Sequence, residues 1–418
     1  MKGILIFLVV FGLLVFVHEF GHFIVAKKCG ILVREFSIGM GPKLLQIRRN
    51  PTTYTIRWLP LGGYVRLANK DDESKIDLGT TVILQLNEQK QVVRIDASES
   101  DLPIEGIPMQ VTQVDLVDDL TITGYENGNE ENEVTYQVAR NATMIDQSKT
   151  ELVIAPRDTQ FQEANVWKKL ATNVAGPLMN IILGFVVFMM WTFTVPGPAT
   201  TTIGKVVADS PAAAAHIEAG TRIAAINGHK TMNFDEISQQ IDQSKGKTLK
   251  IDLVKAGRTE RVNVRPQAVK VQKQTVYQIG IQARGDERAS AKAKRGWDTA
   301  VSTTGMIFNA VGGLFRHFSL NKLSGPVGIY SQTSQVSQMG FSYLLAFLAM
   351  ISINLGIVNL IPIPGLDGGK FLLNLIEIVR GKAISEDHEA MVELVGFGLL
   401  LVLIIAVTGN DIYRYFIK

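Results

Sequence analysis

Two histidines and a glutamate lie close together near the start of the chain, in the segment His18-Glu19-Phe20-Gly21-His22. Side chains four residues apart share one helix face, so His18 and His22 could bind one metal ion. Glu19 lies about 100° further round the helix, where its carboxylate could take a proton from a metal-bound water. The spacing predicts hydrolytic metal chemistry. A catalytic zinc site also needs a third protein ligand and a position for water.

The predicted third ligand is Asp367, near the other end of the chain. It lies in a run from residue 354 to residue 369 that contains Pro362 and Pro364 and ends in Asp-Gly-Gly. Prolines interrupt a helix, and broken backbone at membrane depth occurs only where protein or a water-filled cavity satisfies it. A carboxylate at such a break suits a buried metal ligand. The alternative is that Asp367 only caps a turn.

The histidine pair is embedded in an apolar stretch over residues 3–26, which is long enough to span a bilayer. A charged group at that depth costs about 2.5–3.5 kcal/mol and usually marks a functional site. Residues 1–17, with Lys2 before the apolar run, could instead be a signal peptide. Since no small-residue cleavage site precedes His18, a transmembrane helix is favoured.

Composition agrees with a membrane protein that carries water-exposed domains. The 418 residues are 46% hydrophobic, and the mean hydropathy is +0.17. The net charge of +3 is too small to indicate a nucleic-acid partner. Cys29 is the one cysteine, so no intramolecular disulfide can form. Lys27, Lys28, Lys168 and Lys169 flank two apolar spans, and the positive-inside rule then predicts that residues 28–172 are cytoplasmic.

Alternating residues predict strands after the first helix. Residues 43–47 and 53–58, about a turn at Asn50-Pro51, form a predicted hairpin within 28–69. Several short alternating runs over 70–165 are separated by acidic and Asn/Gly turns. The sequence predicts that this part is a β-rich domain without a group of catalytic residues.

His-Glu-Phe-Gly-His in a first span, with Asn359-Leu-Ile-Pro-Ile-Pro-Gly-Leu-Asp-Gly-Gly in a later one, resembles the site-2 protease family of intramembrane zinc metalloproteases. The likeness is to the bacterial branch with a PDZ domain, which includes regulators of anti-sigma-factor cleavage and processors of peptide pheromones. The resemblance implies Zn²⁺ held by His18, His22 and Asp367, with Glu19 as general base. It also implies that Asn359 positions the substrate backbone, and that the hairpin region is a sheet beside the zinc. A Gly-Pro-x-x-Asn at Gly176–Asn180 matches the family too, and either lines the site or only allows close helix packing.

Residues 199–285 resemble a circularly permuted PDZ domain, through Ile203-Gly-Lys-Val-Val, Ser210-Pro-Ala-Ala and Ile226-Asn-Gly. Residues 277–281 resemble its peptide-binding strand. Arg222 departs from the acidic residue usual at its position. Residues 296–318 show helical amphipathic spacing, which predicts a helix on the outer membrane face or one packed on the PDZ domain.

The sequence thus predicts a polytopic α-helical membrane protein of about four transmembrane helices, with a membrane-associated β-hairpin, a cytoplasmic β-rich insertion and one extracytoplasmic PDZ domain. The predicted boundaries are 1–27 for the first helix, 28–69 for the hairpin region, 70–165 for the β-rich domain, 173–195 for the second helix, 199–285 for the PDZ domain, 296–340 for an amphipathic helix and a turn back into the membrane, 341–375 for the broken third helix, and 391–409 for the fourth helix.

The expected activity is that of a zinc endopeptidase in a bacterial plasma membrane. By the resemblance, it would cut transmembrane segments of single-pass proteins such as anti-sigma factors, remnant signal peptides or pheromone precursors. Its expected partners are these substrates, the lipid bilayer and peptides at the PDZ domain. The alternative is a catalytically silent scaffold that recruits partners through its PDZ domain. A structural zinc site usually has four protein ligands, and only three candidates exist here, which favours catalysis.

Overall fold

The computed structural model describes residues 2–49, 51–69, 76–98, 105–145, 151–271 and 274–414. The predicted hairpin turn at Asn50 and the predicted domain edge at residue 70 lie outside the described residues. The chain forms two compact units, Met1–Gly184 with Thr303–Lys418, and Phe185–Ser302. The first unit contains the candidate site.

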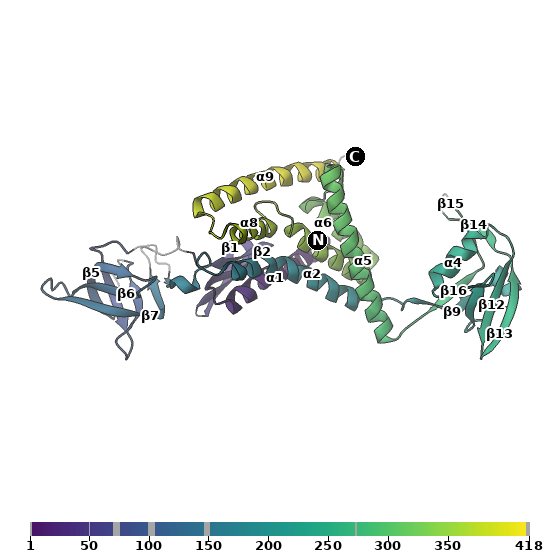
Figure 1. Ribbon diagram of the computed structural model, residues 1–418, viewed down its shortest axis with the longest axis horizontal. Coiled ribbons are helices and arrows are strands. Elements are labelled where there is room, and N and C mark those ends of the chain that lie inside the picture. Colours follow the sequence, from purple (N-terminus) through teal and green to yellow (C-terminus); the bar gives the residue numbers. More distant parts are fainter. Residues whose placement is uncertain are drawn as a thin grey trace. The chain divides into compact units, whose positions relative to one another are not determined.

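Helices make up most of the first unit, and they gather in one group (Figure 1). Their bounds, including two helices that continue into the second unit, are α1 Lys2–Lys28, α2 Val166–Trp191, α5 Ala289–Arg316, α6 Pro326–Met339, α7 Phe341–Asn359, α8 Asp367–Arg380 and α9 Glu386–Ile412, with short 3-10 turns η2 Arg157–Thr159 and η3 Leu320–Lys322. Among the described residues, α1, α2, α7 and α9 are long and apolar enough to span a membrane. The four apolar helices predicted from sequence are therefore present.

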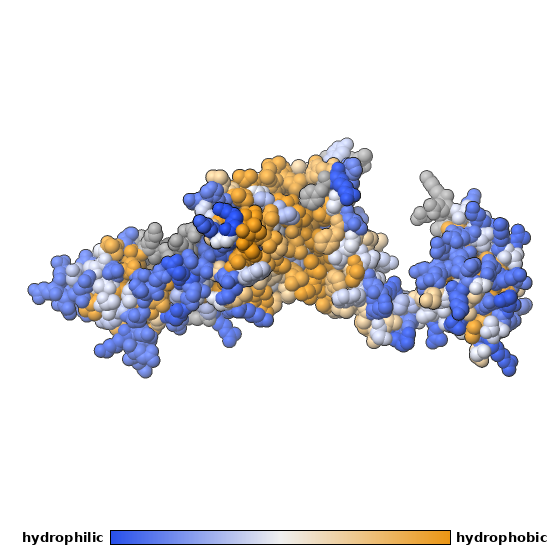
Figure 2. All heavy atoms as spheres, in the orientation of Figure 1, coloured by the Kyte–Doolittle hydropathy of each residue, from blue (hydrophilic) through white to orange (hydrophobic). Residues whose placement is uncertain are grey.

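The apolar surface of these helices is not covered by protein. Only 17% of the apolar stretch of α1 and 11% of that of α9 is buried within the structure. Hydrophobic residues accordingly cover the visible face of the helical group (Figure 2). An apolar surface of this extent is stable only against lipid, which makes the chain a membrane protein.

Two helices differ from the prediction. The second apolar helix begins at Val166 rather than at residue 173, because the polar turn with Lys168 and Lys169 is also helical. The segment predicted as a turn back into the membrane contains a 14-residue helix, α6. Its N-terminal amides at Gly325 and Gly328 donate to the buried Asp411 carboxylate at 2.8 and 2.9 Å. A carboxylate stabilises a helix N-terminus, but this one lies in distant α9, so local sequence gives no sign of it.

The hairpin region contains two long strands, β1 Val33–Arg49 and β2 Thr52–Leu67. Residues 33–38 pair with 63–67 on one side and with 53–56 on the other, while 43–49 pair with 52–57. The two strands thus fold back on themselves and form a sheet wider than a simple hairpin. Gly39, Gly41 and Gly62, with φ of +88°, +86° and +83°, allow the bends.

The β-rich insertion is a separate small sheet. Its strands are β3 Thr81–Leu86, β4 Val92–Asp96, β5 Ile107–Asp115, β6 Thr121–Glu126, β7 Glu133–Ile145 and β8 Glu151–Val153. They follow the order β4-β3-β5-β6-β7-β8, and an additional β4–β7 pairing closes the sheet on itself. This pairing covers the free edge of β4, while β8 lies at the other end of the strand order. The core is formed by fully buried apolar side chains such as Val82, Leu84, Ile95, Met109 and Ile122.

The second unit contains a six-stranded sheet of order β13-β12-β10-β9-β16, with β11 paired to β10. The elements are β9 Ala199–Val206, α3 Pro211–Ala214, β10 Arg222–Ile226, β11 His229–Lys230, α4 Phe234–Gln243, β12 Leu249–Lys255, β13 Arg258–Val264, β14 Gln267–Val271, β15 Gln274–Gln278 and β16 Ile281–Gly285. Fully buried Ile203, Ile223, Ile237 and Ile251 form its core. These strands and helices lie within residues 199–285, the range that resembles a PDZ domain in sequence.

Candidate metal centre

His18 and His22 lie one above the other on α1. Their Nε2 atoms are 3.3 Å apart, and each side chain is only 12–13% exposed. His22 Nδ1 is 2.7 Å from the carbonyl oxygen of Thr172 in α2 and is therefore the protonated nitrogen. His22 Nε2 therefore has the free lone pair that a metal ligand requires.

Asp367 is brought to the histidines by the break between α7 and α8. It is the first residue of α8, where the partial positive charge of the helix end favours a carboxylate. A Cβ at Gly368 would lie 2.2 Å from the Ile361 carbonyl oxygen, and one at Gly369 would lie 2.5 Å from that of Ile363. The two glycines therefore let the connecting loop fold back over the start of the helix, which explains the Asp-Gly-Gly sequence.

Three donor atoms converge at this point. Asp367 Oδ2 is 3.0 Å from His18 Nε2 and 3.4 Å from His22 Nε2. Among the described residues, these three form the one group of His, Cys, Asp and Glu side chains arranged closely enough to hold a metal ion. Two imidazole nitrogens and one carboxylate oxygen are a donor set that catalytic zinc uses.

Space for the His22 ring comes from a glycine on α2. A Cβ at Gly176 would lie 2.2 Å from His22 Nε2, so any larger residue would displace the ring. Gly21 makes a similar close approach from α1, because its Cβ would be 2.5 Å from the carbonyl oxygen of Ala175. These small residues bring α1 and α2 together at the histidines. The residues present thus fit a zinc ion.

Asn180 is a site residue whose role the sequence left open. It is fully buried in α2, its Nδ2 lies 3.3 Å from His18 Nδ1, and its Oδ1 has no partner among the described residues. Amide oxygen and nitrogen are exchanged by a 180° rotation. In the rotated orientation Oδ1 accepts from the His18 Nδ1–H, which frees Nε2 for a metal. The Gly-Pro-x-x-Asn match was the available signal.

Glu19 lies beside the cluster, under the sheet of the hairpin region. A Cβ at Gly63 of β2 would lie 3.1 Å from Glu19 Cγ and 3.2 Å from Val15 Cγ1. The strand that contains Gly63 therefore packs directly on the helix face next to the histidines. Sequence reasoning assigned this region to the neighbourhood of the zinc only through the family resemblance.

A polar network holds this sheet together around Glu35. Its carboxylate accepts from Thr55 Oγ1 at 2.6 Å and Tyr64 OH at 2.7 Å, while Arg57 donates to Tyr64 OH at 2.8 Å and to the Gly41 carbonyl at 2.9 Å. Burial raises the pKa of the Glu35 carboxyl, but the two hydroxyls and the Arg57 guanidinium outweigh it and hold the pKa below its ordinary value.

Asn359 is the last residue of α7 and is half-buried. The loop over residues 360–366 separates it from Asp367, and it is not a member of the three-residue donor group. The other four histidines are likewise not members of that group: His216, His229, His317 and His388.

The chain is similar to known proteins over most of its length. The model of peptidase family M50 matches residues 6–403. "Probable protease eep" of Enterococcus faecalis is 44% identical over 421 residues, and a "Putative zinc metalloprotease" of Streptococcus pneumoniae is 42% identical over 426 residues, each over 100% of both chains. The crystal structure of the PDZ domain of an SdrC-like protein from Listeria monocytogenes is 24% identical and covers 21% of this chain and 88% of that one, with a TM-score of 0.18.

The family match spans most of the chain, and the curated relatives align from end to end. The predicted site-2 protease resemblance, the enzyme class and the zinc cofactor are thereby confirmed. We conclude that the chain belongs to peptidase family M50 and is a zinc metalloprotease of the site-2 type.

Proposed function

We propose that this metalloprotease cuts peptide bonds within the bacterial plasma membrane, in the transmembrane segments of single-pass proteins. The observation that carries the proposal is the location of the donors. His18 and His22 lie in α1, which is apolar and long enough to span a membrane. Asp367 begins α8, which follows α7, a second helix of that kind. The substrate classes implied by the family resemblance are anti-sigma factors, remnant signal peptides and pheromone precursors, which makes regulated intramembrane proteolysis the proposed process.

His18, His22 and Asp367 would hold the zinc. When bound, zinc polarises the scissile carbonyl and lowers the pKa of a water ligand to about 7. A carboxylate oxygen of Glu19 takes a proton from the attacking water and passes it to the leaving nitrogen. The Asn359 amide holds the substrate backbone near the scissile bond.

The sheet of β1 and β2 is proposed to hold the substrate in an extended form. A helical segment hides its peptide bonds in its own hydrogen bonds, so a protease must unwind it. Residues 63–67 pair with residues 33–38 on one side, and Gly63 lies over Glu19. A substrate strand added to the other side would replace the lost helical hydrogen bonds next to the general base.

The PDZ domain is proposed to bind or filter peptides. A cavity of about 200 Å³ lies between α4 and residues 276–281, with Phe234, Ile241, Tyr277 and Ile279 among its lining residues. It includes the residues that resemble a peptide-binding strand. An extended peptide could pair with this strand while its side chains enter the cavity.

The test is cleavage of a single-pass reporter by the full chain in zinc-loaded proteoliposomes. Glu19→Gln should abolish cleavage while bound zinc and thermal unfolding stay at wild-type values, because only the proton transfer is lost. Asp367→Asn should lower the zinc content as well. Equal turnover by wild type and Glu19→Gln would contradict the proposal. A chain that binds zinc and partners without cutting any reporter would support the scaffold alternative. Mass spectrometry of membrane proteins that accumulate with Glu19→Gln would identify the substrates.

A further inference from the structure

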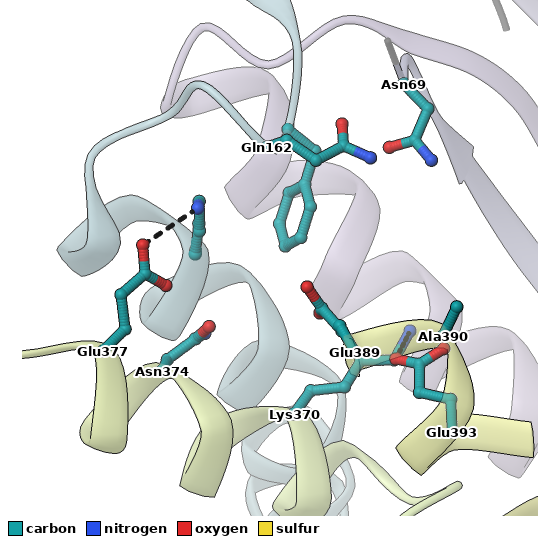
Figure 3. Close-up of a pocket in the computed structure, with 10 residues that line it drawn as sticks. Asn69, Gln162, Lys370, Asn374, Glu377, Glu389, Ala390 and Glu393 are labelled. Carbon is teal, nitrogen blue, oxygen red and sulfur yellow. Dashed lines mark hydrogen bonds and ion pairs between the residues drawn. The ribbon is translucent and has the colours of Figure 1, made fainter. Parts of the chain in front are cut away.

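A polar cavity of about 210 Å³ lies near the metal centre and takes no part in the proposed chemistry. Its walls come from α2, α8, α9 and the segments next to the hairpin region (Figure 3). The lining residues include Phe161, Asn374 and three carboxylates, those of Glu377, Glu389 and Glu393. One water needs roughly 10–15 Å³. The cavity is therefore large enough for a side chain.

Two of its three carboxylates are already paired. Lys169 Nζ lies 3.3 Å from Glu377 Oε1, with side chains 10% and 17% exposed, and Lys370 Nζ lies 3.4 Å from Glu393 Oε1. Glu389 has no ion pair among the described residues, and Figure 3 shows its carboxylate turned toward the cavity. A carboxylate in such a place is stabilised by a cation.

A buried amide in the same cavity also lacks a partner. Asn374 is 6% exposed, and its Nδ2 makes no hydrogen bond within the described residues. Its side chain points into the space between Glu377 and Lys370 (Figure 3). A buried donor without an acceptor costs about 1–3 kcal/mol, so a ligand with an acceptor would be favoured here. The cavity therefore favours a ligand that has both a cationic group and a hydrogen-bond acceptor.

The position of the cavity relates it to the substrate. Asn374 is two helical turns, about 10 Å, after Asp367 on α8. Lys169 is one turn before Thr172, whose carbonyl binds His22. Both helices therefore place the cavity a short distance from the donor cluster. Lys168 precedes Lys169 in the first turn of α2, and Arg380 ends α8, so basic residues lie near the cavity on both helices.

We propose that this cavity is a specificity subsite for a Lys or Arg side chain of the substrate, at the cytoplasmic end of its transmembrane segment. Glu389 accepts from the cationic group, Phe161 packs against the aliphatic stem, and Asn374 Nδ2 donates to a backbone carbonyl of the same residue. An extended chain covers about 10 Å in roughly three residues, so the basic residue lies about three positions from the scissile bond.

This inference rests on the proposed function, because it assumes a single-pass substrate. Such substrates carry Lys and Arg mainly on their cytoplasmic flank, which is the side assigned to the cavity. The subsite would fix the position of the substrate along the site, so that one peptide bond of an otherwise apolar segment lies at the zinc.

The test uses the full chain in proteoliposomes and three reporters that differ only in one flank residue, Arg, Gln or Glu. Wild type should cleave the Arg reporter with a KM about tenfold below that of the Gln reporter and an unchanged kcat, as expected for one charge-assisted hydrogen bond. Glu389→Gln should remove that difference, so that its KM values for the Arg and Gln reporters become equal. Glu389→Lys should shift the preference to the Glu reporter. The matched control is Asp387→Asn, an exposed carboxylate of α9 outside the cavity.

A binding measurement separates this inference from the proposed function. Labelled flank peptides with Arg or Gln are titrated onto Glu19→Gln protein, and Glu389-dependent preference for Arg would support the subsite even if no reporter is cut. Equal KM values for Arg and Gln reporters with equal peptide binding would overturn it. So would a Glu389→Gln or Asn374→Leu variant that slows all three reporters by the same factor, since that result indicates a bracing role alone.

Discussion

The position of the His22 ring depends on a glycine in the neighbouring helix α2. Gly176 lies against the imidazole so closely that a methyl group would stand 2.2 Å from Nε2. Real carbon–nitrogen contacts do not approach that distance, so either the ring or α2 would have to move. The Thr172 carbonyl fixes the other ring nitrogen at 2.7 Å, which leaves the ring little freedom to turn away. The site is therefore sensitive to changes that do not touch any donor atom.

We predict that Gly176→Ala lowers zinc affinity by about 10–100-fold, the usual range when the support of a metal ligand is lost. The measurement is zinc retention against a competing chelator, with circular dichroism to show that the helices persist. Gly398→Ala, in α9, is the matched control because a Cβ there meets no atom within 4 Å. If both variants retained zinc equally, the close approach at Gly176 would not matter.

Asn180 gives a second prediction at this scale. Asn180→Leu removes the only side-chain contact shown for His18 Nδ1 within the described residues and should weaken zinc binding about tenfold or more. Asn180→Asp supplies an acceptor for the ring N–H and should restore most of the affinity. The absorption spectrum of the cobalt-substituted protein reports ligand geometry directly. An unchanged spectrum in Asn180→Leu would show that the amide does not orient His18.

At the scale of elements, hydropathy and helix-breaking residues predicted α1, α2, α7, α9 and the break before Asp367, because each depends on its own residues and on the bilayer. The helix α6 was not predicted, because its N-terminus is stabilised by Asp411 from α9, a contact between residues 83–86 positions apart. For β1 and β2, residue alternation predicted a hairpin, and only the family resemblance implied a sheet. Its extra pairing depends on glycine bends that alternation does not reveal.

The three candidate metal ligands could be proposed from the sequence, whereas the residues that support them could not. His18, His22 and Asp367 are recognisable because metal chemistry restricts the residue types. Gly176, Gly63 and the Thr172 carbonyl act through shape and backbone geometry, which a single sequence does not display. Asn180 is an intermediate case. The sequence showed its Gly-Pro-x-x-Asn motif, but it did not show that Asn180 contacts His18.

The polar network of the sheet predicts a pH dependence. The folded-state pKa of Glu35 lies below its ordinary value of about 4.3, so its stabilising contribution is present above that pH and is lost as the pH falls through the folded-state pKa. Hydrogen exchange of residues 33–67 should therefore be faster in Glu35→Gln than in wild type at neutral pH. The difference should shrink as the pH falls below about 4.

Glu130→Gln serves as the control for that experiment, because Glu130 is an exposed carboxylate in the β-rich domain. It should leave exchange in the sheet unchanged at every pH. A difference between Glu35→Gln and wild type that grew as the pH fell would reverse the predicted sign and contradict the assignment.

At the scale of the whole molecule, the distribution of basic residues bears on orientation. Lys27 and Lys28 end α1, Lys168 and Lys169 lie in the first turn of α2, and Arg380 ends α8. If α1 and α2 span the bilayer in opposite directions, these ends share one side, and the positive-inside rule makes that side cytoplasmic. The β-rich domain before α2 would then face the cytoplasm, and the PDZ domain after α2 would face outward.

Cysteine labelling tests this orientation, because Cys29 is the single cysteine of the chain. In a Cys29→Ser background, Lys247→Cys and Glu130→Cys each place one thiol at an exposed position, in the PDZ domain and the β-rich domain respectively. A membrane-impermeant maleimide should label Lys247→Cys in intact cells and Glu130→Cys only after permeabilisation, while the background chain stays unlabelled. Labelling of both in intact cells would mean that α2 does not cross the bilayer. The apolar surroundings of His18 and His22 on α1 would then need another explanation, because α2 supplies the Thr172 carbonyl that holds His22.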